Sequence, residues 1–147
     1  MNLEDLLSQG RLRRRSASKA EIRGLLQVAD RDLKDAAVPG LSADRLFLIA
    51  YEAVLALATV PLRCAGYESH GQGHHWTTFQ ALTLTMGDDL QDLSDYFESC
   101  RNKRNVGAYD RSGAISRSEA AELLEEARAF KGKVTEWLRD NLPEFLD

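Results

Sequence analysis

The sequence predicts an all-α protein, an antiparallel bundle of about five helices joined by short loops. Apolar residues recur at helical spacing in several long segments, and many stretches are rich in Ala, Leu and Glu, which favour helix. Only three prolines interrupt the 147 residues, and no segment shows the apolar–polar alternation that is typical of a half-buried strand. A single domain of this length, with 44% hydrophobic and 29% charged residues, buries a sizeable core without disulfides.

The first part of the chain, residues 1–17, is expected to be a basic N-terminal arm or a short helix ahead of the bundle, which takes up residues 18–147. Four of residues 11–15 are arginines, and a solvated arm explains such a charge run better than a contact with RNA. The formal net charge of the chain is −4, so there is no overall attraction to nucleic acid. Any site for a negatively charged ligand must therefore be local.

The first two long helices are placed by their caps and breaks. Ser18 is the expected N-cap of the first helix, with Glu21 three residues later as in a capping box, and Val38-Pro39-Gly40 ends it. Ser42 begins the second helix, whose run from Leu46 to Leu62 is apolar on nearly all sides. The second helix is therefore expected to be packed on several sides.

The apolar run of the second helix raises the question of a membrane span. The run is short for a span and carries Glu52 in its middle, so a buried central helix is the better interpretation. Pro61 is expected to kink or end this helix. The start of the chain does not resemble a signal peptide, and we expect a cytoplasmic protein without membrane contact.

Two further helices are expected after a turn-rich connection over residues 66–73. The first of them runs from His74 to about Met86, and Gly87 breaks it. Asp88 is expected to cap the next helix, whose first turns are acidic and whose end is basic, as the helix dipole favours. These two helices are expected to follow the central helix in the bundle.

The last helix is expected to begin at Ser116 or Ser118 and to end at Pro143. Its apolar residues follow a 4-3-4-3 spacing: Leu123, Ala127, Phe130, Val134 and Trp137. This stripe is similar to that of a coiled coil and predicts packing along another helix.

Thiols and imidazoles are the residues with redox or metal-binding potential. Cys64 and Cys100 form no CxxC pair and are expected to be reduced thiols in a cytosolic protein. His70, His74 and His75 are close in sequence, but glycines separate the first two, and adjacent residues of a helix point to different sides. We expect no metal and no cofactor. His74 and His75 are instead expected to pack at the start of their helix or to line a ligand cleft.

The end of the fourth helix is the candidate site. Spacings of three and four residues place four polar side chains on one helix face: Arg101, Arg104, Asn105 and Tyr109. Guanidinium groups on a core-directed face need partners, and their forked donors suit phosphate oxygens, so we expect a phosphate-bearing ligand, with Lys103 contributing. The alternative, that the arginines pair with acids of a neighbouring helix or subunit, is about equally favoured by the residues alone.

The segment Arg104-Asn105-Val106-Gly107-Ala108-Tyr109 resembles the signature of the HEPN proteins (higher eukaryote and prokaryote nucleotide-binding). These helical bundles carry an Arg, usually followed by Asn, and a His a few residues later. The apolar segment Tyr51–Ala58 and the glycine-rich loop before His74-His75 resemble a bacterial branch of the same family. The likeness follows the order of elements from about Leu41 to Trp137.

The resemblance implies a HEPN-like fold and a homodimer, in which two Arg motifs face each other across a cleft at the two-fold axis. Active members are metal-independent ribonucleases, in which the His helps to deprotonate the ribose 2′-hydroxyl and the Arg steadies the scissile phosphate. By position, Arg104 would hold the phosphate and Tyr109 would stand in the place of the His. Many members sit beside a minimal nucleotidyltransferase, which implies such an enzyme as a partner protein.

The chain departs from the family pattern at Tyr109, since no His follows His75. An unperturbed tyrosine, with a pKa near ~10, is a poor general base at neutral pH, whereas a histidine near ~6.5 is a good one. We therefore expect a protein that binds nucleotide or RNA phosphate in a toxin–antitoxin or nucleotidyltransferase-associated system, with weakened or absent nuclease activity. One alternative is an endoribonuclease that uses Arg104 with Tyr109 or a loop histidine. The other is a structural interaction module.

Overall fold

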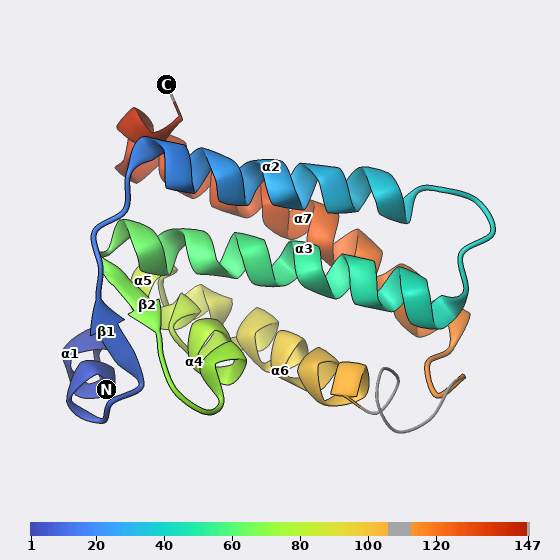
Figure 1. The fold of residues 1–147 in the computed structure, drawn as a ribbon, viewed down its shortest axis with the longest axis horizontal. Coiled ribbons are helices and arrows are strands. Elements are labelled where there is room, and N and C mark those ends of the chain that lie inside the picture. The colour runs from blue at the N-terminus through green and yellow to red at the C-terminus, as the bar shows by residue number, and fades with distance from the viewer. Residues whose placement is uncertain (106–112, 147) are drawn as a thin grey trace.

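The computed structural model describes residues 1–105 and 113–146 and confirms an all-α helical bundle. The long helices α2, α3, α6 and α7 make up most of it, and shorter elements gather at one end (Figure 1). In chain order the elements are α1 (Leu3–Ser8), β1 (Leu12–Arg14), α2 (Lys19–Ala36), α3 (Ala43–Cys64), β2 (Tyr67–Ser69), α4 (His74–Gln80), α5 (Leu82–Met86), the 3-10 turn η1 (Asp88–Leu90), α6 (Gln91–Asn105), α7 (Arg117–Asn141) and the 3-10 turn η3 (Pro143–Phe145).

Helix α3 is the centre of the bundle, as predicted. Helices α2 and α7 run along it, and α4, α5 and α6 pack against it as well (Figure 1). Ser42 caps α3 by accepting a hydrogen bond from the backbone N–H of Arg45 at 3.1 Å. Of the described helices, α3 alone is long and apolar enough to span a membrane, but 61% of its most apolar stretch is buried inside the protein. Pro61 does not end α3, which continues to Cys64, because a proline in the last turn removes few backbone hydrogen bonds.

The predicted serine caps of the flanking helices are present. Ser18 accepts a hydrogen bond from the backbone N–H of Glu21 at 3.1 Å. The carboxylate of Glu21 pairs with Arg63 of α3 rather than closing the expected capping box. Ser116 and Glu119 do form a full capping box at the start of α7.

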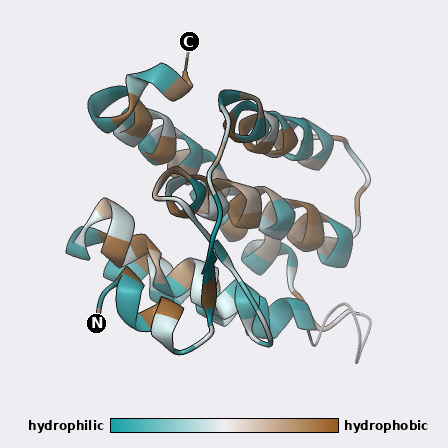
Figure 2. Cartoon of the chain, turned by 60° about the vertical axis from the view of Figure 1, so that its left-hand side comes forward, coloured by the Kyte–Doolittle hydropathy of each residue, from teal (hydrophilic) through white to brown (hydrophobic). Residues whose placement is uncertain are grey.

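Aromatic rings connect the helices in the core. Phe97 of α6 lies against Phe79 of α4 and Phe130 of α7, with ring centroids 5.6 and 5.0 Å away. Tyr51 of α3 meets Phe79 edge-on. The apolar stripe predicted for α7 is buried in this core, apart from the half-buried Trp137. Figure 2 shows the apolar colour concentrated on α3 and on the inward sides of its neighbours, so the polar end of α6 is fixed by a rigid core.

The third predicted helix is in fact two short helices, α4 and α5, which meet at Ala81. The carbonyl oxygen of Phe79 accepts a hydrogen bond from the Ser94 hydroxyl at 2.8 Å, and threonine hydroxyls of both helices bond to carbonyls of the preceding turn. Such side-chain bonds compete with the helix and favour a bend. Gly87 ends α5 as predicted, with a φ of 113°. Asp88 makes no cap, since a 3-10 turn precedes α6.

The N-terminal segment is folded and is not the solvated arm that the sequence analysis favoured. The short helix named as the alternative is present as α1, and β1 pairs with β2 in an antiparallel ribbon with Arg13 opposite Glu68. Leu6, Leu12 and Tyr67 are buried together in a second, smaller core. The expectation that the chain has no strand is wrong here, because three-residue strands are too short to show an alternating pattern.

Arg63, which is 5% exposed, connects this segment to the bundle. Its guanidinium donates to the carbonyl oxygens of Arg15 at 2.6 Å and Ser16 at 3.1 Å, and to Glu21 at 2.6 Å. On α4, Thr77 accepts a hydrogen bond from the Arg11 guanidinium, which also stacks on the ring of Trp76. The basic residues at the start of the chain therefore have structural partners.

Candidate functional site

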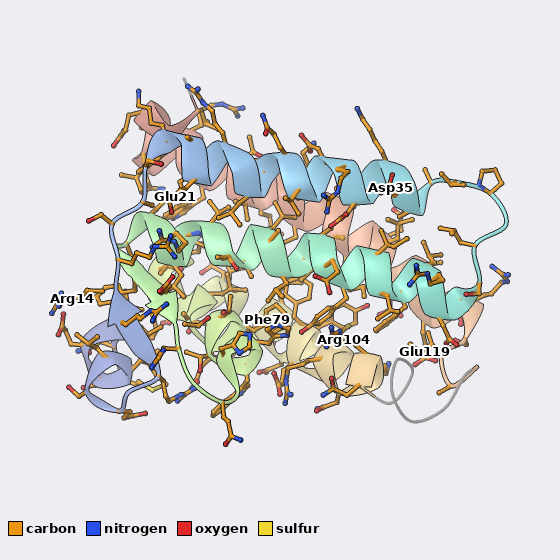
Figure 3. All side chains as sticks on the ribbon, viewed as in Figure 1. Arg14, Glu21, Asp35, Phe79, Arg104 and Glu119 are labelled. Atoms are coloured by element: carbon orange, nitrogen blue, oxygen red, sulfur yellow. The ribbon has the colours of Figure 1, made fainter. Side chains whose placement is uncertain are left out.

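The predicted polar face of α6 meets α3 and α4 at the end of the bundle. Arg104 points from the last turn of α6 toward α3, as Figure 3 shows. Tyr51 of α3 lies under the guanidinium, and His75 of α4 lies within hydrogen-bonding distance of the hydroxyl of the same tyrosine. Arg101, one turn earlier, acts electrostatically on both rings. We call Tyr51, His75, Arg101 and Arg104 the arginine cluster.

Arg104 is largely buried and has partners on α3. Its side chain is 18% exposed, and one terminal nitrogen lies 3.6 Å from a carboxylate oxygen of Glu52. The guanidinium carbon lies 5.3 Å from the centroid of the Tyr51 ring, which is a cation–π contact. Glu52 is 50% exposed, so this ion pair is open to solvent and to a competing anion. The pairing with an acid of a neighbouring helix, one of the two alternatives from the sequence, is present.

His75 is the histidine that the fold brings to the arginines. Its Nδ1 lies 3.0 Å from the hydroxyl oxygen of Tyr51, and the hydroxyl donates to Nδ1 when the imidazole proton is on Nε2. Partial burial, followed by the charges of His74 and of the two arginines, lowers the pKa of His75 from 6.5 to about 4. Burial raises the pKa of Tyr51. At neutral pH the cluster therefore contains a neutral imidazole and a protonated phenol.

Arg101 is held by its own helix. Its Nε and Nη2 atoms donate to the carboxylate of Glu98 at 3.0 and 2.6 Å, and this hydrogen bonding raises the pKa of Arg101. The side chain is 27% exposed. A phosphate that binds Arg101 must therefore use its remaining N–H donors or compete with Glu98.

The other predicted site residues are outside these contacts. Lys103 turns toward α7 and pairs with Glu119 at 2.9 Å, so it is not part of the arginine cluster. His74 is exposed and contacts the neighbouring imidazole edge to face at 4.5 Å. Asn105 ends α6 and is half-buried. Tyr109, the expected substitute for the family histidine, lies outside the described residues.

A groove beside the cluster carries further arginines that the sequence analysis missed. It lies between α2, α3 and the end of α6 and has a volume of about 470 Å³. Its lining residues are Val28, Arg31, Asp32, Arg45, Leu48, Ile49, Glu52 and Arg104. Three guanidinium groups from three helices thus border one groove with an apolar floor. We call it the arginine groove.

Asp32 is the nearly buried acid of the arginine groove, 7% exposed. One carboxylate oxygen accepts from Arg31 at 3.1 Å, while the other is buried and has no hydrogen-bond partner among the described residues. A buried acceptor without a donor costs free energy. This oxygen therefore marks a place where a donor group supplied from the groove would be stabilised.

These features differ in how visible they are in the sequence. Arg31 and Arg45 lie more than 50 residues before Arg104, and no local spacing connects them. Tyr51 has a signal in the sequence, because a tyrosine within a buried, mostly apolar helix usually finds a hydrogen-bond partner. Glu98 also has a signal in the sequence, because it precedes Arg101 by three residues, a spacing that favours an ion pair within a helix.

Metal and thiol chemistry have little support in the described part of the chain. Within residues 1–105 and 113–146, no three His, Cys, Asp or Glu side chains are grouped so that they would hold a metal ion. Cys64 and Cys100 are free, and burial raises the pKa of each thiol to about 11, which disfavours the reactive thiolate.

The fold and the site together define the class of protein: a helical bundle with an arginine-lined groove at the end of one helix. Comparison of the chain with models of protein families, with curated proteins and with solved structures finds no match. The function must therefore be argued from the groove and the cluster themselves.

Proposed function

We propose that the chain binds nucleotide or RNA phosphate in the arginine groove, with weak or absent nuclease activity. The observation that carries this proposal is the meeting of Arg31, Arg45 and Arg104 at one groove. Guanidinium forks match the oxygens of a phosphate group, and bidentate contacts of this kind are strong. Arg45 is exposed, and none of its side-chain nitrogens contacts a described residue closely enough for a hydrogen bond or ion pair. It is therefore available to an incoming anion.

The remaining walls of the groove suit the rest of a nucleotide. Leu48 and Ile49, together with Val28, offer an apolar surface on which a base can lie. The second carboxylate oxygen of Asp32 is an acceptor for a hydroxyl or an amine of the same ligand, after a small side-chain adjustment. A free inorganic phosphate would use the arginines alone, so the groove favours a larger ligand.

The ribonuclease alternative rests on His75, the histidine nearest to Arg104. A general base works best when its pKa is near the working pH. The pKa of His75 is lowered to about 4, so the ring is a weak base at pH 7. Its Nδ1 also lies at hydrogen-bond distance from Tyr51. The cluster therefore supports binding more than cleavage.

The HEPN resemblance extends the proposal to assembly and context. In that family two Arg motifs meet at a two-fold axis, and we propose a cytoplasmic homodimer with the ends of α6 near the axis. A nucleotidyltransferase is the proposed partner protein, in a toxin–antitoxin or related two-component system. A structural interaction module without a ligand is the competing function, and it predicts no phosphate affinity.

The test is a titration with a fluorescent single-stranded RNA and with ATP at several salt concentrations, with chelator present. Arg45→Ala is the informative variant, since its side chain has no hydrogen-bond or ion-pair partner to lose among residues 1–105 and 113–146. We expect weaker binding and a salt slope reduced by about 1, as for the loss of one phosphate contact. Arg139→Ala, at an exposed position near the far end of α7, is the control with the same charge change.

Equal binding by wild type, Arg45→Ala and Arg104→Ala would contradict the proposed groove. Absence of any affinity in wild type would favour the structural module. RNA cleavage that persists with chelator and is abolished in His75→Gln would establish the ribonuclease instead.

A further inference from the structure

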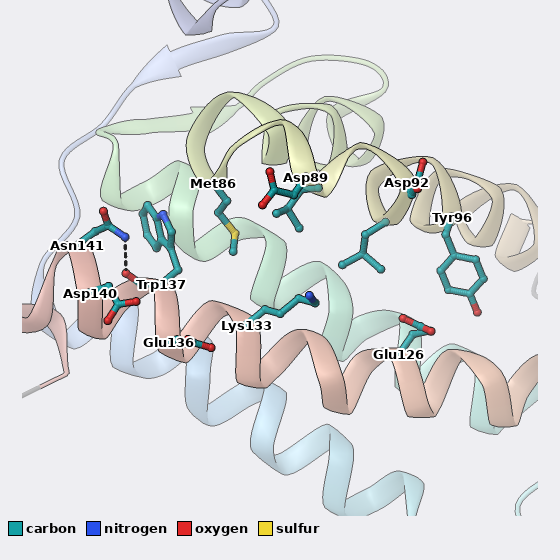
Figure 4. Close-up of a pocket in the computed structure, with 12 residues that line it drawn as sticks. Met86, Asp89, Asp92, Tyr96, Glu126, Lys133, Glu136, Trp137, Asp140 and Asn141 are labelled. Carbon is teal, nitrogen blue, oxygen red and sulfur yellow. Dashed lines mark hydrogen bonds between the residues drawn. The ribbon is translucent and has the colours of Figure 1, made fainter.

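A second groove lies at the other end of α6, between α5, η1 and the start of α6 on one side and the C-terminal half of α7 on the other (Figure 4). Its volume is about 520 Å³. It shares no lining residue with the arginine groove, so it is a separate surface. We call it the acidic groove.

The floor of the acidic groove is apolar. It is made by Met86, Leu90, Leu93, Tyr96 and Trp137. Methionine and large aromatic residues are enriched where proteins bind one another, since methionine adapts its shape and the rings bury a large area. Beyond Trp137 a further apolar depression continues toward Cys64 and Leu142. The groove thus offers an extended apolar track.

The rim of the acidic groove is strongly negative. Figure 4 shows Asp89 and Asp92 on one wall, with Glu126, Glu136 and Asp140 on the other. Among the described residues, Lys133 is the only basic one that lines this groove. None of the five carboxylates forms an ion pair with a described residue, whereas many other carboxylates of the chain are paired, among them Glu4, Glu21, Glu68, Glu98 and Glu119. The negative charge of the rim is therefore not balanced by ion pairs with described residues.

The dimensions fit a helix. Along α7 the groove extends from Glu126 to Asn141, which is about 22 Å at a rise of 1.5 Å per residue. A helical segment of about 15 residues has the same length. An apolar face on such a helix would cover the floor, and flanking Lys or Arg side chains would reach the rim.

We propose that the acidic groove docks a basic amphipathic helix of a partner protein. This proposal does not depend on ligand binding in the arginine groove. A second copy of this chain is a poorer occupant, because the long outer helices α2 and α7 mix acidic with basic residues. A bare polyamine would satisfy the rim but leave the apolar floor exposed to water.

The probe is a 15-residue Leu–Lys peptide with its leucines on one helical face, titrated into ¹⁵N-labelled full-length protein. The chain contains two tryptophans, so the indole signals report on two places. Trp137 lies in the acidic groove, and Trp76, on α4 and 42% exposed, lies outside it. We expect the peptide to shift the Trp137 signal and to leave that of Trp76 unchanged. A matched Leu–Glu peptide should not bind.

Two pairs of variants remove the same charge from different places. Asp92→Asn with Asp140→Asn neutralises the rim, while Asp35→Asn with Glu144→Gln neutralises two exposed acids that do not line the groove. We expect the rim pair to weaken peptide binding about fivefold more than the control pair, in line with two exposed ion pairs. Leu93→Ser tests the floor with the rim charges intact, and circular dichroism checks that each variant is folded.

Several results would overturn the proposal. They are no binding of the Leu–Lys peptide, equal binding of the Leu–Glu peptide, equal losses in the two charge pairs, or a peptide that shifts Trp76 and not Trp137. A Trp137 signal that moves with protein concentration alone would assign the groove to a second copy of the chain and would also overturn it.

Discussion

The partial burial of His75 beside positive charges makes the stability of the fold depend on pH. The pKa of His75 is lowered from 6.5 to about 4 in the folded protein, mainly by burial. Between these two values the unfolded chain binds a proton that the folded chain does not, so protonation favours unfolding. This contribution is complete above pH 6.5 and is lost progressively as the pH falls toward 4. We predict that His75→Gln reduces this loss of stability.

The size of the effect follows from the same pKa. A change from 6.5 to about 4 corresponds to about 3 kcal/mol between the two protonation states. The ring is only half-buried, and solvent screening reduces this figure. We therefore expect wild type to lose about 1–2 kcal/mol more stability than His75→Gln between pH 7 and pH 4.5.

The assay is urea unfolding at a series of pH values, followed by circular dichroism. Carboxylates also titrate near the lower end of the range, so the difference between wild type and His75→Gln is the quantity of interest. His74→Gln is the matched control, since His74 is exposed and should leave most of the pH dependence in place. Parallel stability profiles for wild type and His75→Gln, or a His75 imidazole that titrates near 6.5 by NMR, would refute the reasoning.

Other predictions concern packing, assembly and the motif. Arg63→Met should cost about 2 kcal/mol by urea unfolding, since it removes the hydrogen bonds that this nearly buried guanidinium donates to Arg15, Ser16 and Glu21. Phe97→Ala should cost about 3–5 kcal/mol in the same assay, because its ring has no exposed surface. Light scattering should show a dimer, and a monomer at all concentrations would contradict the two-fold cleft. Tyr109→His should introduce chelator-resistant RNA cleavage that Arg104→Ala abolishes, because it supplies a base near neutral pH.

The long helices α2, α3 and α7 were predictable from the sequence because each combines a serine cap with a sustained apolar period. Ser18, Ser42 and Ser116 are N-caps in the structure, and the stripe of α7 is buried. The β1–β2 ribbon was not predictable, since three residues carry no period and its pairing joins distant segments. The break between α4 and α5 depends on Ser94 reaching Phe79, a tertiary contact that local sequence does not contain.

The candidate site was predictable only along one helix. Spacing put Arg101 and Arg104 on a shared face, and the structure places both beside Tyr51. His75 was named only as one of two possible cleft-lining histidines and Arg45 was not named at all, because both meet Arg104 only after three helices have packed. Pairing with an acid of a neighbouring helix was left open as one of two alternatives, and the Arg104–Glu52 ion pair is of this kind, whereas the Arg101–Glu98 pair lies within α6 and was not predicted.

The β1–β2 ribbon has a consequence for the order in which the chain assembles. Its register pairs Leu12 with Ser69, so α2 and α3 lie inside the loop that it closes. Two strands of three residues are not stable alone, and closing a long loop costs entropy that only later contacts offset. The ribbon therefore forms after α2 and α3 have packed. We therefore expect the segment before α2 to become ordered late among the described residues, and its amide hydrogens to be among the first of these to exchange when the native protein opens locally.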